Sequence, residues 1–150
     1  VRPVVRHQCG ERTLTVAKQA YRDHGVDVEL LPFIEDMAEV YAWADLVVCR
    51  SGALTVAELC AAGLPAVFVP YPAAVDDHQT ANAGPMVATG AAAILQQSDL
   101  TPSRLAGLLR EWLTSRKVLL DRAEKARALA APNALRRITE LCLELGGATA

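Results

Sequence analysis

The residues best suited to chemistry lie in one stretch, where a turn of small residues, Arg50–Gly52, leads into a predicted helix. Thr55 lies in the first turn of this helix, and Glu58 follows on the same face, about one turn or 5 Å further along. The first amides of a helix have no partner within the helix and attract anions, phosphate above all. A diphosphate bound there would bring an attached ribose to the carboxylate of Glu58. The spacing therefore favours a nucleotide diphosphate site.

Each of these residues also has a simpler explanation. Ser51 is a common N-cap residue, Gly52 is a common turn residue, and Glu58 is of a type that often faces solvent on a helix. Turns of this kind open helices in many α/β proteins, so the spacing alone leaves both interpretations open. No base is positioned near Ser51 in the sequence, which argues against a nucleophilic serine.

Two further loops carry side chains or backbone groups that could bind a ligand. Phe33 offers a face for stacking on a base, and the backbone N–H and C=O of Ile34 could read one edge of a pyrimidine. Packing in the core is the alternative for both. The polar cluster Asp76–Gln79 precedes another predicted helix, where it could cap the helix or bind sugar hydroxyls. Asp76 and Asp77 alone do not make a metal site, and a helix start neutralises a diphosphate without one, so no metal is expected.

The elements that position these loops alternate between strands and helices. Strands are expected over five short segments: Val1–His7, Val26–Leu31, Leu46–Cys49, Ala66–Val69 and Ala91–Leu95. Helices are expected between and after them: Glu11–His24, Glu35–Trp43, Ala53–Ala62, His78–Ala88, 103–114, 117–130 and 133–145. Short connections between alternating elements predict an α/β fold with a doubly wound, Rossmann-like parallel sheet. Ligands of such sheets bind at the carboxyl ends of the strands, which groups the loops 32–36, 50–55 and 70–79 in one crevice.

Four details of this pattern can be tested against a structure. The run Leu46–Cys49 is expected to be buried on both faces of the sheet. Gly25 and Gly63 are expected to end the helices before them. The pair at 84–85, Gly-Pro, is expected to break or kink its helix, and the tail 146–150 is expected to fray.

Length, composition and charge exclude several classes of protein. The chain has 150 residues and 52% hydrophobic content, enough for one core and a single domain over residues 1–150. Its opening is expected to continue from a longer protein, and no apolar run approaches roughly 18 residues, the length of a membrane span. A net charge of −2 argues against nucleic-acid binding. The four cysteines lack metal-ligand spacing, which favours reduced, buried thiols in a cytoplasmic domain. The absence of G-x-G-x-x-G argues against a dinucleotide-dependent dehydrogenase.

Residues 101–137 are distinctly basic, with nine Lys and Arg residues against three acids. A solvent-facing set of helices would explain this excess. Contact with an anionic membrane surface or partner is the alternative.

Five segments together resemble the C-terminal half of the MurG family, bacterial glycosyltransferases that add N-acetylglucosamine to lipid I and so form lipid II for peptidoglycan. The segments are Phe33–Met37, Tyr41–Asp45, Cys49–Thr55, Ala61–Pro65 and Asp76–Asn82. The similarity covers nearly the whole chain, and the run Arg-Ser-Gly-Ala-Leu-Thr with its downstream Glu is specific. The resemblance implies the C-terminal half of a GT-B glycosyltransferase and a domain that binds UDP-N-acetylglucosamine.

The resemblance also implies which residues hold the base and the sugar. Ile34 would hydrogen-bond the uracil through its backbone, with Phe33 covering the base and Met37 near it. The family's adjacent polar pair that holds the donor sugar falls on His78 and Gln79. Gln79 is favoured, because the loop is a residue longer than in some members and His stands where Gln is often found.

The phosphates and the ribose would be held at the central turn and helix. The resemblance places the diphosphate on the turn and the first helical residues: Ser51, Gly52, Ala53, Leu54 and Thr55. Glu58 would take the ribose hydroxyls. No catalytic residue is expected in this chain.

The family's N-terminal domain, with its glycine-rich loops, membrane-association surface, acceptor site and catalytic base, has no counterpart in this sequence. A glycine-rich loop and an Arg that touch the donor from just upstream are missing as well. The chain is therefore expected to be the donor half of an inverting transferase, inactive alone. Its acceptor would be undecaprenyl-linked lipid I, and the full-length enzyme would be cytoplasmic and peripheral on the inner membrane.

Two alternatives to this assignment stay open. One is the donor subunit of a two-chain N-acetylglucosamine transferase, as in dolichol-linked glycan assembly. The other is a non-catalytic nucleotide-binding domain that has kept the fold. UDP-N-acetylglucosamine 2-epimerases share the architecture, but they would need catalytic carboxylates that the sequence does not place.

Overall fold

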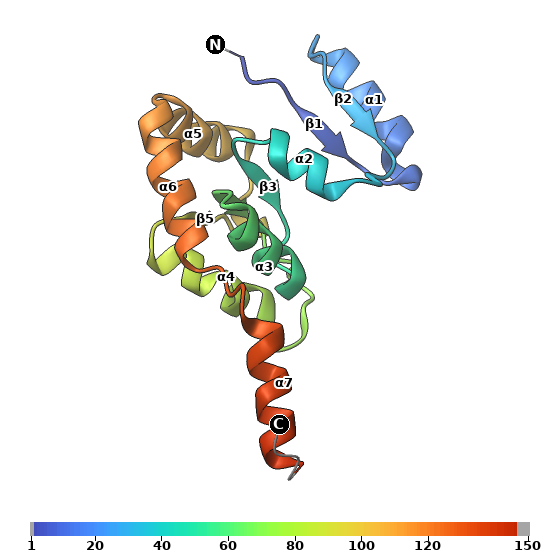
Figure 1. The fold of residues 1–150 in the computed structure, drawn as a ribbon. Helices are drawn as coiled ribbons and strands as arrows, with labels where there is room; N and C mark the ends of the chain where they lie inside the picture. Colours follow the sequence, from blue (N-terminus) through green and yellow to red (C-terminus); the bar gives the residue numbers. More distant parts are fainter. Residues whose placement is uncertain (1, 147–150) are drawn as a thin grey trace. The chain divides into compact units, whose positions relative to one another are not determined.

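The computed structural model describes residues 2–146, and the chain divides into two compact units, Val1–Val40 and Tyr41–Ala150 (Figure 1). Each unit has its own parallel sheet. Residues 147–150 of the tail that is expected to fray lie outside the described residues.

The first unit contains a pair of parallel strands, β1 (Arg6–Gln8) and β2 (Glu29–Leu31). Both strands begin later than the sequence predicts, at Arg6 rather than Val1 and at Glu29 rather than Val26. β1 and β2 pair only with each other in a two-stranded sheet, so neither strand extends beyond the residues of the other that it pairs with. Pro3, which has no N–H to donate, adds to the late start of β1.

Two helical segments of the first unit follow the predicted pattern closely. A short 3-10 turn, η1 (Glu11–Thr13), leads into α1 (Leu14–Asp23). Gly25 follows the end of α1 with a left-handed φ of 59°, as expected of a residue that ends a helix. The next helix, α2 (Met37–Trp43), begins two residues later than predicted, because Asp36 Oδ1 accepts from the N–H of Glu39 and so caps it.

The second unit is built on three parallel strands in the order β3-β4-β5: β3 (Val47–Cys49), β4 (Ala66–Phe68) and β5 (Ala92–Ile94). The central strand, β4, is fully buried along its length. β3 lies at an edge of this sheet, and Val48 is 45% exposed. The prediction that Leu46–Cys49 is buried on both faces is therefore wrong, and β4 is the strand with that environment.

Helices cover both faces of this sheet. The helical segments are α3 (Ala53–Ala62), η2 (Val75–Asp77), α4 (His78–Ala88), η3 (Gln97–Asp99), α5 (Pro102–Leu113), α6 (Arg116–Ala128) and α7 (Ala134–Leu145). Phe68 packs in one core cluster with Leu59 of α3 and Met86 of α4, whereas Val67 packs in a second cluster with Trp112 of α5. Successive side chains of a strand point to opposite faces, so this sheet is wound on both sides. The predicted α/β class is confirmed.

The ends of α3 and α4 show one confirmed prediction and one correction. α3 ends as predicted, with Gly63 at a left-handed φ of 71° and its N–H donating to the C=O of Cys60. α4 continues through Pro85, so the predicted break is wrong. Ala83 and Met86 are fully buried on either side of it. Their packing holds the helix together although the proline removes one backbone hydrogen bond.

Two further observations concern the chain as a whole. Among residues 2–146, no helix combines the length and hydrophobicity needed to cross a bilayer. The four cysteines are all free thiols, but Cys60 is buried and Cys142 is exposed, so the expectation of uniformly buried cysteines is wrong.

Candidate functional site

The start of α3 follows directly on the carboxyl end of β3. Gly52 is the N-cap residue, with φ −62° and ψ 146°, and no side chain caps the helix. The N–H of Val56 donates to the C=O of Gly52 at 2.9 Å, and the amides of residues 53–55 precede this first helical bond. Leu54 is 80% exposed, so the first turn is not covered by the part of the chain that the structure describes. The first turn of α3 therefore presents amides of the kind that bind anions.

Ser51 adds an unsatisfied hydroxyl to this helix start. Its side chain is fully buried, and its Oγ has no hydrogen-bond partner within residues 2–146. Its C=O accepts from Nδ2 of Asn82 on α4 at 3.1 Å. The simpler explanation of Ser51 as the N-cap is wrong, because Gly52 takes that position. A buried hydroxyl without a partner costs about 1–3 kcal/mol, and because Ser51 Oγ is enclosed by protein it is not itself exposed to a ligand.

Glu58 is exposed on α3, and a tyrosine holds one of its oxygens. The hydroxyl of Tyr41, at the end of α2, donates to Glu58 Oε2 at 3.0 Å. Burial, together with this hydrogen bond, raises the pKa of the Tyr41 phenol, which therefore keeps its proton at neutral pH. Glu58 Oε1 has no hydrogen-bond partner within the described chain. The sequence pattern did not indicate Tyr41 as a site residue.

Arg50, whose role the sequence pattern also did not indicate, connects the ends of the three strands. Its Nη1 donates to the C=O groups of Val69 and Pro70, both at 2.9 Å. Its Nη2 donates to Gln97 Oε1 at 2.7 Å, and its guanidinium lies 5.5 Å from the ring centre of Tyr71. Because these partners follow β4 and β5, one side chain ties together the loops at the carboxyl ends of β3, β4 and β5.

The loop after β4 orients one of the two predicted sugar-binding residues. Gln79 Oε1 accepts from the N–H of Tyr71 at 2.9 Å, which leaves Gln79 Nε2 to donate. His78, the first residue of α4, is exposed. Of His78 and Gln79, Gln79 is the residue whose side-chain oxygen is already bonded, so its side-chain NH2 group is the part left to bind a sugar.

The acidic pair of this loop serves the loop itself. Asp76 and Asp77 both have a φ of 51°, in the left-handed region that Asp tolerates better than most residues. Asp77 makes no side-chain cap bond to the backbone of α4, so the predicted capping cluster is wrong in that form. Its Oδ1 instead accepts from Thr80 Oγ1 at 2.7 Å, which ties the loop to the first turn of α4.

The residues predicted to hold a base lie in the first unit. Phe33 is 68% exposed, so the alternative of core packing is wrong for it, whereas Ile34 and Met37 are half-buried. The N–H of Ile34 donates to Gln8 Oε1 at 3.1 Å, so a base could use this amide only in place of Gln8. The grouping of loop 32–36 with the two loops of the second unit stays a prediction.

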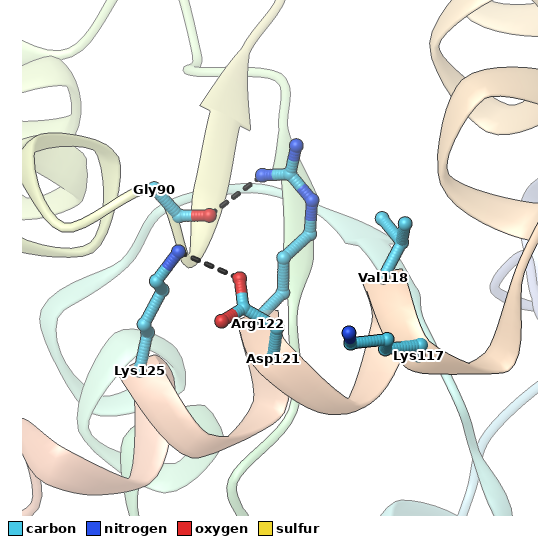
Figure 2. A pocket seen from close by; sticks show the side chains of 6 residues that line it. All are labelled: Gly90, Lys117, Val118, Asp121, Arg122 and Lys125. Atoms are coloured by element: carbon cyan, nitrogen blue, oxygen red, sulfur yellow. Dashed lines mark hydrogen bonds and ion pairs between the residues drawn. The ribbon is translucent and has the colours of Figure 1, made fainter.

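A cavity of about 350 Å³ lies at the opposite edge of the same sheet, beside the turn that precedes β5. Figure 2 shows its lining residues: Gly90, Lys117, Val118, Asp121, Arg122 and Lys125. Two of its cations contact protein groups, because Arg122 Nη1 donates to the C=O of Gly90 and Lys125 Nζ pairs with Asp121, each at 2.6 Å. Arg122 Nε alone among its nitrogens is buried without a partner in residues 2–146, whereas at the start of α3 the unpaired groups are backbone amides and a carboxylate oxygen.

Many of the basic residues of 101–137 have partners inside the chain. Five of the nine make an ion pair or donate to a carbonyl: Arg104, Arg122, Lys125, Arg127 and Arg136. This pairing favours the explanation that the helices face solvent, rather than the alternative that they form a surface for anionic lipid. Contact with a membrane stays a prediction.

The carboxyl edge of the second unit offers binding groups rather than a nucleophile. Burial raises the pKa of the Cys49 thiol at the end of β3 to about 12, so it stays protonated at neutral pH. An open helix start, an anchored carboxylate and an oriented amide donor together suit a ligand that carries phosphate beside sugar hydroxyls.

Known proteins resemble nearly all of this chain. The family model for the glycosyltransferase family 28 C-terminal domain matches residues 3–138. The chain is 56% identical over 143 residues to the UDP-N-acetylglucosamine--N-acetylmuramyl-(pentapeptide) pyrophosphoryl-undecaprenol N-acetylglucosamine transferase of Marinobacter nauticus. It is 55% identical over 143 residues to the transferase of the same name from Alkalilimnicola ehrlichii.

A solved structure agrees with these relatives. The crystal structure of Acinetobacter baumannii MurG matches with a TM-score of 0.87 and 48% identity, over 94% of this chain and 41% of that one. The two transferases are matched over 95% of this chain but over 39% and 40% of their own lengths. The chain thus spans about two fifths of the length of the relatives it matches.

Proposed function

The chain belongs to the family of glycosyltransferase family 28 C-terminal domains, and on that premise we propose that it binds UDP-N-acetylglucosamine as the donor half of a glycosyltransferase. Its fold is the C-terminal half of a GT-B transferase. The names of these relatives specify the transferred sugar, N-acetylglucosamine, and a lipid-linked acceptor. We carry both over to this chain as part of the proposal.

The open start of α3, with Glu58 exposed one turn later, carries this proposal. The amides of Ala53, Leu54 and Thr55 would bind the diphosphate. Gly52 places no side chain in the path of the phosphates. Glu58 would accept hydrogen bonds from the ribose hydroxyls, since a carboxylate has acceptor sites for two donors.

The base and the sugar would lie on either side of this diphosphate. Uracil would stack on the exposed ring of Phe33, with Ile34 and Met37 beside it. The N-acetylglucosamine would be held by Gln79 rather than His78, because the Oε1 of Gln79 is already bonded and its Nε2 is left to donate.

In the whole enzyme, a hydroxyl of the acceptor sugar would attack the anomeric carbon of N-acetylglucosamine as UDP leaves, with inversion. Negative charge grows on the departing diphosphate, and the prealigned dipoles of α3 would stabilise it without a metal ion. The acceptor site and the base that takes the hydroxyl proton would belong to the part of the relatives that this chain does not span. The isolated chain would therefore bind donor but not turn it over.

The whole protein would convert lipid I to lipid II for peptidoglycan. Its lipid-linked acceptor would place it at the cytoplasmic face of the membrane as a peripheral protein. Within the basic region, four side chains that make no hydrogen bond or ion pair within the described residues could contact anionic lipid: those of Arg110, Arg116, Lys117 and Arg137.

Calorimetric titration of the chain with UDP tests the proposed donor site. Glu58→Ala removes the carboxylate that would bind the ribose, and we expect UDP affinity to fall about 10- to 100-fold, the usual worth of hydrogen bonds to a charged group. Glu124→Ala, which removes an equally exposed carboxylate from α6, is the matched control and should leave UDP affinity unchanged. Absence of UDP binding by the unmodified chain, or equal affinity in Glu58→Ala, would contradict the proposal.

A further inference from the structure

Tyr41 lies on a different helix from Glu58, yet its hydroxyl contacts the carboxylate directly. We propose that Tyr41 is a positioning residue that holds Glu58 in the orientation that binds ribose. This inference rests on the proposed function, because it assigns Glu58 to the ribose. It goes further by naming the group that prepares Glu58 before the nucleotide arrives.

The two residues differ in how firmly the fold holds them. The ring of Tyr41 packs against the core cluster that contains Leu59 and Phe68. Glu58 projects from the exposed side of α3, where a free glutamate side chain samples many rotamers. Fixing such a side chain costs conformational entropy, so a hydrogen bond that fixes it beforehand favours ligand binding.

The hydrogen-bonding capacities of the two groups fit this role. The phenol has one hydrogen, which it donates to Glu58 Oε2 at 3.0 Å, so it has none left to donate to a ribose hydroxyl. A carboxylate has roughly four acceptor sites, and Tyr41 uses one of them. Oε1 and the second site on Oε2 remain for the 2′- and 3′-hydroxyls. Tyr41 would therefore act through Glu58 and not on the ligand.

A double-mutant cycle with two nucleotides tests this inference by calorimetry. We expect Tyr41→Phe, which keeps the packed ring, to weaken UDP binding roughly fivefold, within the range of a single hydrogen bond. The same change should leave the affinity for 2′,3′-dideoxy-UDP unaltered, because that nucleotide lacks the hydroxyls that Glu58 would bind. In a chain that already carries Glu58→Ala, Tyr41→Phe should have no further effect on UDP affinity.

Tyr21→Phe provides a matched control in the other unit. Tyr21 is also partly buried, and its hydroxyl bonds His7 Nδ1 at 3.2 Å. Removing this hydroxyl should leave both nucleotide affinities unchanged, and a thermal melt of each variant would show that it is folded.

Three results would overturn the positioning role of Tyr41. They are an unchanged UDP affinity in Tyr41→Phe, an equal loss of affinity for both nucleotides, and a loss that persists in the Glu58→Ala background. The first result would show that the Tyr41 hydroxyl does not affect the ligand, and either of the other two would show that it affects binding by a route other than Glu58. An unmodified chain that fails to bind UDP would instead reject the proposed function itself, and with it this inference.

Discussion

Two arginines at opposite edges of the β3-β4-β5 sheet make the same kinds of contact. Arg50, at the carboxyl edge, donates to two loop carbonyls and lies beside the ring of Tyr71. Arg122, at the amino edge, donates to the C=O of Gly90 and lies 3.9 Å over the ring of Trp112. Trp112 is only 2% exposed, so Arg122 covers a core residue.

Arg122 Nε is buried without a hydrogen-bond partner in the described residues, but the two edges differ in the exposed groups that they leave unpaired. At the amino edge, the ends of helices present carbonyls, and side chains such as Arg127, which donates to the C=O of Ala61, satisfy them. At the carboxyl edge, helices begin and present amides. Both terminal nitrogens of Arg50 have protein partners there, but the start of α3 and Glu58 Oε1 keep exposed, unused hydrogen-bonding capacity. The amino edge thus stabilises the fold, and the carboxyl edge is equipped for a ligand.

Arg122→Met removes the contacts of Arg122 at the amino edge and should produce the largest loss of stability. It leaves the C=O of Gly90 without a partner and removes the cation over Trp112, so the free energy of unfolding should fall by about 3 kcal/mol. UDP affinity of the folded variant should not change. Urea denaturation and a UDP titration measure the two quantities.

Lys117→Met is the control for this cavity, because Lys117 lines it and its ammonium group makes no hydrogen bond or ion pair within the described residues. Its free energy of unfolding should stay within about 0.5 kcal/mol of the unmodified chain. The comparison fails if Arg122→Met is as stable as Lys117→Met, or if it loses UDP binding while folded.

Arg50→Met should show the reverse pattern. Two carbonyls and Gln97 lose their shared donor, which should lower the free energy of unfolding by about 1–2 kcal/mol. The larger consequence should be a roughly tenfold loss of UDP affinity, because the loops around Gln79 and the start of α3 lose the side chain that ties them together. The same two measurements apply. Unchanged UDP affinity would mean that the loops hold their places without Arg50.

Local signals in the sequence were enough for several elements of the fold. The bounds of α3 and α4 match the predicted ranges, because a turn residue, a helix start and a glycine end lie close together in the chain. Features that depend on neighbours in space rather than in sequence were predicted wrongly. The exposure of Val48 follows from the edge position of β3, and the continuity of α4 through Pro85 follows from the burial of Met86.

The candidate site divides in the same way. Gly52, Thr55 and Glu58 were indicated by local spacing, and the family resemblance added the base and sugar residues, whose roles stay predictions. Tyr41 and Arg50 were missed because their partners lie far along the chain. Tyr41 contacts a residue 17 positions away, and Arg50 contacts residues 19 and 47 positions away. No helical or strand period encodes such pairs.

Gly52→Ala adds a single methyl group and tests the difference between the carboxyl and amino edges with the smallest expected effect on the fold. Gly52 has a φ of −62°, which any residue adopts, and a Cβ there would lie 3.8 Å from Thr55 Oγ1, an ordinary contact. The fold has room for a Cβ at this position, and although alanine is a poorer N-cap residue than glycine, the free energy of unfolding should fall by no more than about 1 kcal/mol. A methyl group beside the first turn of α3 should nevertheless obstruct a phosphate, and we expect UDP affinity to fall about tenfold.

Gly84→Ala on α4 is the matched control for this substitution, since a Cβ at Gly84 would meet nothing within 4 Å and no ligand role is proposed for it. Its UDP affinity should equal that of the unmodified chain, as a titration of both variants under the same conditions would show. A methyl group that weakens UDP binding at Gly52 but not at Gly84, in chains that both stay folded, would indicate that the ligand needs the glycine more than the fold does. Equal affinity in the two variants would mean that no phosphate approaches this backbone, and the carboxyl edge would then differ from the amino edge in packing alone.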